Sequence, residues 1–132
     1  MPETAAQGRD ARAEQAPILV VDDDRLVRQA IRWALEDEGL QVETVADGHQ
    51  ALKRLAQRKP ALVVLDLTLP LHSGDEVAAA VRAAYGAVPI LVITADGHAA
   101  AKAQRMGAIG YLHKPFEIET LIRAVQRGLR AV

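Results

Sequence analysis

The sequence predicts an α/β protein with a doubly wound parallel sheet that carries helices on both faces. Short apolar runs of four to six residues, rich in β-branched types, recur along the 132-residue chain. Such runs are typical of strands buried on both faces. Apolar residues with helical spacing lie between them. Hydrophobic residues make up 50% of the chain but aromatics only 3%, so we expect one domain with an aliphatic core.

Strand and helix segments alternate along the chain. The expected strands are residues 18–21, 41–46, 61–65, 88–93 and 109–112. The first helix follows Asp24 and ends at Gly39, where glycine is a common stop signal. The other expected helices are residues 51–55 (before Pro60), 77–84 (closing near Gly86), 99–106 (ending at Gly107) and 118–129. This alternation predicts a parallel sheet.

Residues 1–16 are polar and Ala-rich without periodicity, so we expect a disordered N-terminal tail. One domain is expected over 17–131. The last helix runs to the C-terminus, so we expect no second, output domain. No internal repeat is visible.

Composition excludes several classes of function. The formal net charge is -1, which argues against a protein that binds nucleic acid through a basic surface. The absence of cysteine excludes disulfides and thiolate metal sites. The N-terminal segment has no apolar secretory core, and the apolar runs are far shorter than the roughly 20 residues that span a bilayer. We therefore expect a soluble, cytoplasmic protein.

Polar side chains follow four of the expected strands. In open parallel sheets, ligands bind at the carboxyl ends of the strands, and the residues found there are Asp22 and Asp23, Asp66, Thr94, and His113 with Lys114. Adjacent carboxylates repel one another, so their convergence calls for a cation. Oxygen-only ligands favour Mg²⁺ first and Mn²⁺ next. With a lysine and a hydroxyl nearby, a carboxylate in this group could accept a phosphoryl group.

The segments VVDDD, LVVLDLTLPLHSGDE, ILVITA and GYLHKPF, in this order and spacing, resemble the receiver domain of two-component response regulators. The resemblance covers about residues 17–131. It implies a flavodoxin-like, five-stranded parallel sheet of order 2-1-3-4-5 with five helices. It also implies a single-domain protein that signals by phosphorelay.

The resemblance implies a role for each residue at the strand ends. Asp66 would accept the phosphoryl group, and Lys114 would pair with a phosphoryl oxygen. Asp23 would bind Mg²⁺ directly together with Asp66, and Asp22 would orient the ion through water. The backbone carbonyl of Thr68 would complete the protein ligands.

A second set of residues would form a switch. Thr94 would move toward the phosphorylated site, and Tyr111 would turn inward. These movements would couple the site to the face made by the segments 99–106, 109–112 and 118–129. The Lys114–Pro115 peptide is expected to be cis.

The resemblance implies a signalling protein rather than an enzyme. Its phosphoryl donor would be a histidine kinase or histidine phosphotransferase, and its output a downstream protein, with no direct contact to nucleic acid or membrane. No organic cofactor is implied. One alternative is a receiver module cut from a longer DNA-binding regulator.

Two other classes fit less well. An aspartyl-phosphate phosphatase would place an acid two residues after its nucleophile, where this chain has Thr68. A flavin-binding protein of the same sheet order would need a phosphate-binding loop after the first strand and more aromatic residues.

Five further residues carry separate expectations. Asp24 is expected to be the N-cap of the first helix rather than a metal ligand, and His113 to point away from the site. Trp33 either covers the edge of the core or marks a partner surface. Thr68 and Asp96 lie two residues after Asp66 and Thr94, respectively. We hypothesise that Asp96 influences hydrolysis of the acyl phosphate electrostatically, while Thr68 leaves water access open.

Overall fold

The structure, a computed structural model, describes residues 16–69, 71–95 and 97–130. The chain alternates between strand and helix. The elements are β1 (Ile18–Val21), α2 (Arg25–Asp37), β2 (Val42–Val45), α3 (Gly48–Leu55), β3 (Leu62–Asp66), α4 (Gly74–Tyr85), β4 (Ile90–Thr94), α5 (Ala99–Arg105), β5 (Gly110–His113) and α6 (Ile118–Arg130).

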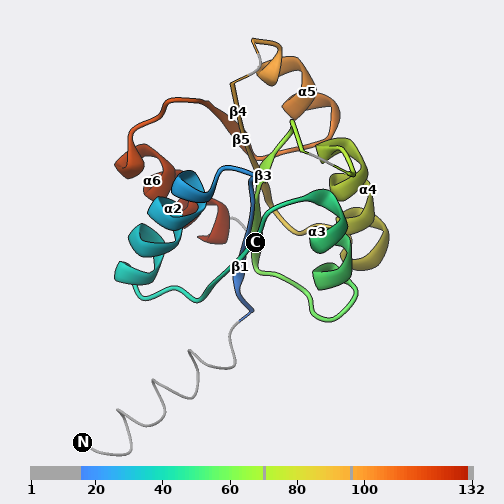
Figure 1. Cartoon of the computed structure of the whole chain (residues 1–132), viewed down its shortest axis with the longest axis horizontal. Helices are drawn as coiled ribbons and strands as arrows, with labels where there is room; N and C mark the ends of the chain where they lie inside the picture. The colour runs from blue at the N-terminus through green and yellow to red at the C-terminus, as the bar shows by residue number, and fades with distance from the viewer. Residues whose placement is uncertain (1–15, 70, 96, 131–132) are drawn as a thin grey trace, which may run out of the picture.

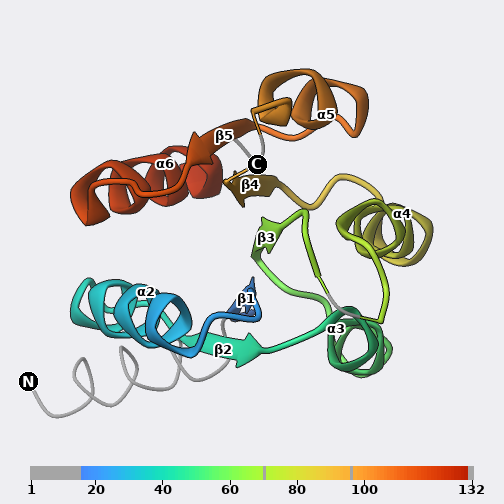
Figure 2. The same ribbon diagram turned by 45° about the horizontal axis from the view of Figure 1, so that its top comes forward.

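The helices lie to either side of the central strands (Figure 1), and the five strands form one parallel sheet in the order β2-β1-β3-β4-β5 (Figure 2). β1 lies between β2 and β3, so that Val20 is in register with Thr44 on one side and Val64 on the other. The connection that leaves β1 leads to β2 on one side of it, and the connection that leaves β3 leads to β4 on the opposite side. The topological switch point therefore lies at the carboxyl ends of β1 and β3. The predicted fold class and strand order are confirmed.

Helices cover both faces of the sheet (Figure 2). α2 and α6 lie on one face, and α3, α4 and α5 lie on the other. Side chains alternate between the two faces along a strand: Ile18 and Val20 pack with the α2 and α6 side, and Leu19 and Val21 with the other. This two-sided burial explains why β1 reads as an unbroken apolar run.

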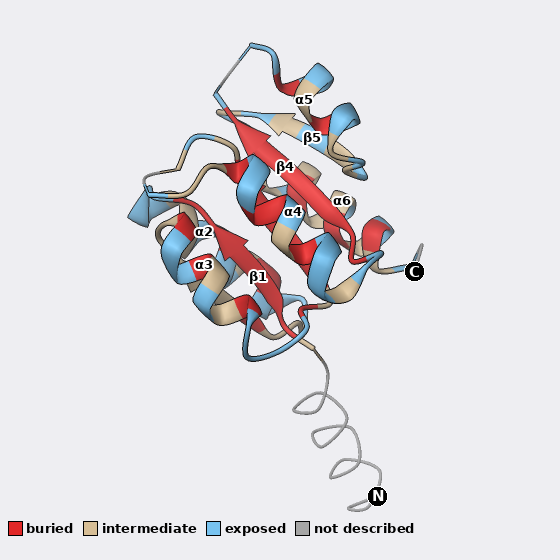
Figure 3. Ribbon diagram, turned by 90° about the vertical axis from the view of Figure 1, so that its right-hand side faces the viewer, coloured by how far each residue is buried: buried red, intermediate tan, exposed pale blue. Residues whose placement is uncertain are grey.

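Burial is lowest at the β5 edge of the sheet (Figure 3). All five residues of β4 are buried, whereas β5 alternates between partly buried and exposed positions. Ile109 and Tyr111 are 45% and 47% exposed. The edge strand β5 is therefore available on its outer side.

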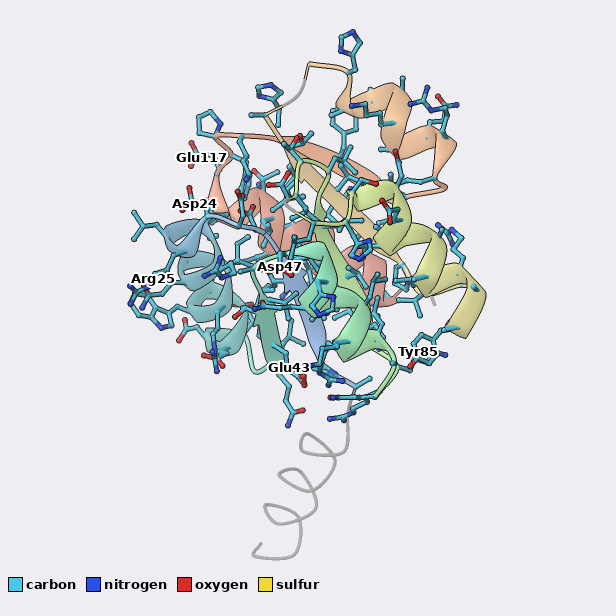
Figure 4. All side chains as sticks on the ribbon, turned by 45° about the vertical axis from the view of Figure 1, so that its right-hand side comes forward. Asp24, Arg25, Glu43, Asp47, Tyr85 and Glu117 are labelled. Carbon is cyan, nitrogen blue, oxygen red and sulfur yellow. The ribbon has the colours of Figure 1, made fainter. Side chains whose placement is uncertain are left out.

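Helix boundaries follow local capping chemistry. Asp24 is the N-cap of α2, as predicted, and accepts hydrogen bonds from the backbone N–H groups of Leu26 and Val27. α3 begins three residues before its apolar pattern because Asp47 caps it by accepting from Gln50 N–H; Figure 4 labels both aspartates. The other helices lie within a few residues of their predicted positions.

Several predictions concern the chain ends. Residues 1–15 and 131–132 lie outside the described residues, so the predicted tail over 1–16 and the domain limits 17–131 stay predictions. No helix in the described part of the chain is long and apolar enough to span a bilayer.

Candidate functional site

Three carboxylates meet at the carboxyl edge of the sheet. Asp22 and Asp23 directly follow β1, and Asp66 is the last residue of β3. One ligand oxygen from each lies within 4.8 Å of the other two. Asp22 is 0% exposed and Asp66 4%, while Asp23 faces solvent. The sequence prediction that these residues converge is confirmed.

Lys114, which follows the edge strand β5, approaches the two buried carboxylates. Its Nζ lies 2.7 Å from Oδ2 of Asp22 and 3.0 Å from Oδ2 of Asp66. The residue directly follows β5, and its backbone N–H donates to the carbonyl oxygen of Thr94 at 2.9 Å. One ammonium group thus offsets part of the repulsion between two like charges buried at the ends of neighbouring strands.

Burial and charge act in opposite directions on these groups. Burial raises the pKa of Asp66 above its ordinary value, although hydrogen bonds from the Thr68 N–H (3.0 Å) and from Lys114 oppose that rise. Burial alone would lower the pKa of Lys114, but the close carboxylates of Asp22 and Asp66 outweigh it and raise that pKa. Lys114 is therefore cationic at neutral pH.

The backbone around Asp22 is fixed by two further contacts. Oδ1 of Asp22 accepts from the Asp24 N–H at 2.8 Å. A guanidinium N–H of Arg28 donates to the carbonyl oxygen of Asp22 at 2.8 Å. Sequence reasoning missed Arg28. The available signal was its place one helical turn after Asp24, which directs its side chain back toward the N-terminus of α2.

The donor set fits a hard divalent cation. Only carboxylate oxygens contribute to the cluster, and oxygen ligands suit Mg²⁺. Among the described residues, the buried Oδ2 of Asp22 has no hydrogen bond besides its ion pair with Lys114, so it retains lone pairs for an ion or its water. Asp24 is committed to capping α2 and is not a member of the cluster.

The predicted switch residues lie at different distances from the cluster. Thr94 is fully buried at the end of β4, in register with His113 of β5. Tyr111 is in register with Val92, farther back along the sheet, and is exposed. The structure thus brings Thr94 to the rim of the site but leaves Tyr111 outside it. The Lys114–Pro115 peptide is cis, as predicted.

Trp33 lies on the outer surface of α2 and does not cover the core. It is 62% exposed. It lines an apolar groove of about 720 Å³ between α2 and the segment that follows β5. Lys114 and Phe116 form the opposite wall of this groove, so the groove adjoins the carboxylate cluster.

Asp96, to which a role was assigned, lies outside the described residues. The hypothesis that it tunes hydrolysis stays a prediction. Thr68 follows Asp66 closely enough for its N–H to bond the Asp66 carboxylate. The exposed His113 alternates with the partly buried Leu112 along β5.

The 2-1-3-4-5 parallel sheet defines a flavodoxin-like protein, and the acidic cluster and lysine at its switch point form an oxygen donor set that suits a divalent cation beside a buried carboxylate. The sequence model of the response regulator receiver domain matches residues 18–126. The chain belongs to the receiver domain family of response regulators.

Individual relatives agree with this assignment. The chain is 41% identical over 115 residues to the response regulator MprA of Mycolicibacterium vanbaalenii, covering 86% of this chain and 50% of the relative. The MprA of Mycobacterium leprae is 39% identical over the same length, with the same coverage of each chain. The chain therefore spans about half the length of these curated relatives.

Solved structures show the same fold. The chemotaxis response regulator CheY4 of Vibrio cholerae superimposes with a TM-score of 0.79 at 36% identity, covering 86% of this chain and 98% of that one. NtrX from Brucella abortus gives a TM-score of 0.81 at 32% identity, covering 89% of this chain but 27% of NtrX. The fold thus occurs both as nearly a whole chain and as part of a longer one.

Proposed function

We propose that this receiver domain accepts a phosphoryl group on the Asp66 carboxylate from a phosphohistidine of a histidine kinase or histidine phosphotransferase. In this step an Asp66 oxygen forms a bond to phosphorus as the phosphorus–nitrogen bond to the donor imidazole breaks. The single observation that carries the proposal is the contact of Lys114 Nζ with Asp66 Oδ2 at 3.0 Å. It pairs a carboxylate with a cation able to neutralise the incoming phosphoryl oxygens.

Each charged residue has one part in this reaction. Asp23 and Asp66 would hold Mg²⁺ directly, Asp22 would orient it through water, and the Thr68 carbonyl would complete the set. The ion would offset negative charge on the transferring phosphoryl group; Mn²⁺ is the second choice. Lys114 moves no proton in this scheme and acts as a fixed charge.

The phosphorylated carboxylate then acts as a signal rather than as a step in turnover of a substrate. Thr94 would move toward the new phosphoryl oxygens, and Tyr111 would turn from its exposed position toward the sheet. The face made by α5, β5 and α6 would change, and a downstream protein would bind it. The exposed edge of β5 supports this choice of face.

Two points of biological setting belong to the same proposal. We place the domain in the cytoplasm, where its kinase partners present phosphohistidine. We expect no direct nucleic-acid contact, because the net charge is -1. A receiver module within a longer DNA-binding regulator remains the alternative, since the chain spans 50% of MprA.

The test is phosphorylation by acetyl phosphate and Mg²⁺, read by intact-protein mass. The wild type should gain one phosphoryl group, Asp66→Ala should gain none, and chelation of Mg²⁺ should abolish the gain. Asp37→Ala, at the exposed end of α2, is the matched control and should behave as wild type. A mass gain in Asp66→Ala would overturn the site assignment.

A second measurement addresses the switch. Thr94→Ala should still be labelled on Asp66, because the threonine hydroxyl takes no part in bond formation. Its β5 amides should then fail to show the change in hydrogen exchange that labelling produces in the wild type. Equal exchange changes in both chains would show that Thr94 is not the switch.

A further inference from the structure

α5 (Ala99–Arg105) is held in place by little apolar packing. Its buried residues are Ala99 and Ala103, whose single methyl groups remove little apolar surface from water. A seven-residue helix is too short to be stable through its own backbone hydrogen bonds. The position of α5 therefore depends on contacts made at its ends.

Arg82 of the neighbouring helix α4 makes such a contact. Its Nε donates to the carbonyl oxygen of Met106 at 3.1 Å, and its Nη2 donates to those of Met106 and Gly107 at 2.7 and 2.8 Å. Both carbonyls directly follow α5, where a helix leaves acceptors unsatisfied and its dipole is negative. The planar guanidinium satisfies two acceptors at once and carries the complementary charge.

Arg82 bridges an open space between the two helices. A pocket of about 260 Å³ separates them, lined by Ala78 and Ala79 of α4 and by Met106 beyond α5, among others. Gly107 has φ +68°, and a Cβ added there would lie 3.1 Å from Arg82 Nη2. Glycine thus provides both the backbone conformation and the room for this approach.

We propose that Arg82 is a positioning residue of the output face: it ties the C-terminal end of α5 to α4 and limits how readily α5 leaves this position. The restraint acts between the two proposed switch residues, because α5 follows the strand ending at Thr94 and leads into the strand carrying Tyr111. Its regulatory meaning rests on the proposed function. A weaker restraint would raise the population of the alternative arrangement that phosphorylation selects.

Hydrogen exchange on the unphosphorylated chain tests the restraint directly. In Arg82→Ala, amides of residues 99–108 should exchange about tenfold faster, as expected from the loss of charge-assisted hydrogen bonds. Arg82→Lys keeps the charge but loses the fork and should be intermediate. Arg123→Ala, on the exposed side of α6, is the control and should match wild type.

The pattern of exchange separates positioning from general stability. Amides of β1 and β3 should be unchanged in Arg82→Ala. Unchanged exchange over 99–108, or an equal acceleration in every element, would overturn the positioning role.

Labelling by acetyl phosphate and Mg²⁺ tests the regulatory part. Arg82→Ala should gain the phosphoryl group about threefold faster than wild type, because more of the population is competent. Faster exchange with an unchanged labelling rate would overturn the regulatory part. If neither chain is labelled, the proposed function fails and the regulatory part fails with it, while the exchange result alone decides whether Arg82 positions α5.

Discussion

Replacing Lys114 by methionine should reveal how much of the stability depends on one ammonium group. The change leaves Asp22 and Asp66 facing each other without a counter-ion, and their side chains are only 0% and 5% exposed. Removing one partner of a buried ion pair costs about 3–5 kcal/mol. The Lys114 side chain is 20% exposed, so water takes part in screening and we expect the lower end, about 3 kcal/mol.

The assay is urea unfolding followed by circular dichroism in the presence of EDTA. With a slope of about 1.5 kcal/mol per M, the midpoint of Lys114→Met should fall by about 2 M. Lys59→Met is the matched control, because Lys59 is exposed in the loop before β3, and its midpoint should stay within about 0.3 M of wild type.

Magnesium provides the second half of this prediction. Without the competing ammonium, the carboxylate cluster should bind Mg²⁺ about tenfold more tightly, which at saturating ion adds about 1.4 kcal/mol to the stabilisation that wild type gains. Mg²⁺ should therefore restore part of the lost stability. An unchanged midpoint in EDTA, or an equal Mg²⁺ increment in both chains, would refute the reasoning.

Substitutions at three further positions test other contacts by urea unfolding. In Gly74→Ala the new Cβ would lie 2.8 Å from the Cα of Leu67 and 3.1 Å from the carbonyl oxygen of Asp66. The free energy of unfolding should therefore fall by about 1–3 kcal/mol, and an unchanged urea midpoint would contradict this. The hydrogen bond from Arg54 is the chief reason that the pKa of Glu43 lies below its ordinary value. The contact therefore stabilises the fold fully above the unfolded-state pKa of about 4.3, and this stabilisation is lost as the pH falls through the lower pKa that Glu43 has in the folded state. Glu43→Gln should therefore cost up to about 1 kcal/mol at pH 7 and nothing in stronger acid; a deficit independent of pH would exclude this explanation. Ser73→Ala removes the capping box of α4 and should cost about 1 kcal/mol, whereas Ser73→Thr should retain most of it.

The sequence alone predicted those features that follow from the apolar pattern of the strands and from the residues at the strand ends. The unbroken apolar runs predicted the strands because both faces of the sheet are covered. The proximity of the Asp22 and Asp66 carboxylates could be predicted because the carboxyl ends of parallel strands lie at a common edge of the sheet. Lys114 followed from the same rule, and the structure places its Nζ 2.7 and 3.0 Å from them.

Long side chains that reach between elements could not be predicted in this way. Arg82 contacts a backbone 24 residues farther along the chain, and its position in α4 differs little from that of any exposed arginine. Arg28 makes a similar contact at shorter sequence separation. Its guanidinium donates to the backbone carbonyl of Asp22, and no pattern of side chains predicts a bond to a backbone carbonyl. Trp33 was open to two interpretations because the spacing along α2 placed it beside the apolar stripe, not on it.

The exposure of Trp33 affects which experiments this domain permits. It is the only tryptophan in the chain and is already 62% exposed in the folded state, so unfolding changes its surroundings little. Its emission is a weak signal for denaturation but a sensitive one for anything that enters the adjoining groove, whose far wall includes Lys114. The domain thus carries a natural optical probe beside its carboxylate cluster.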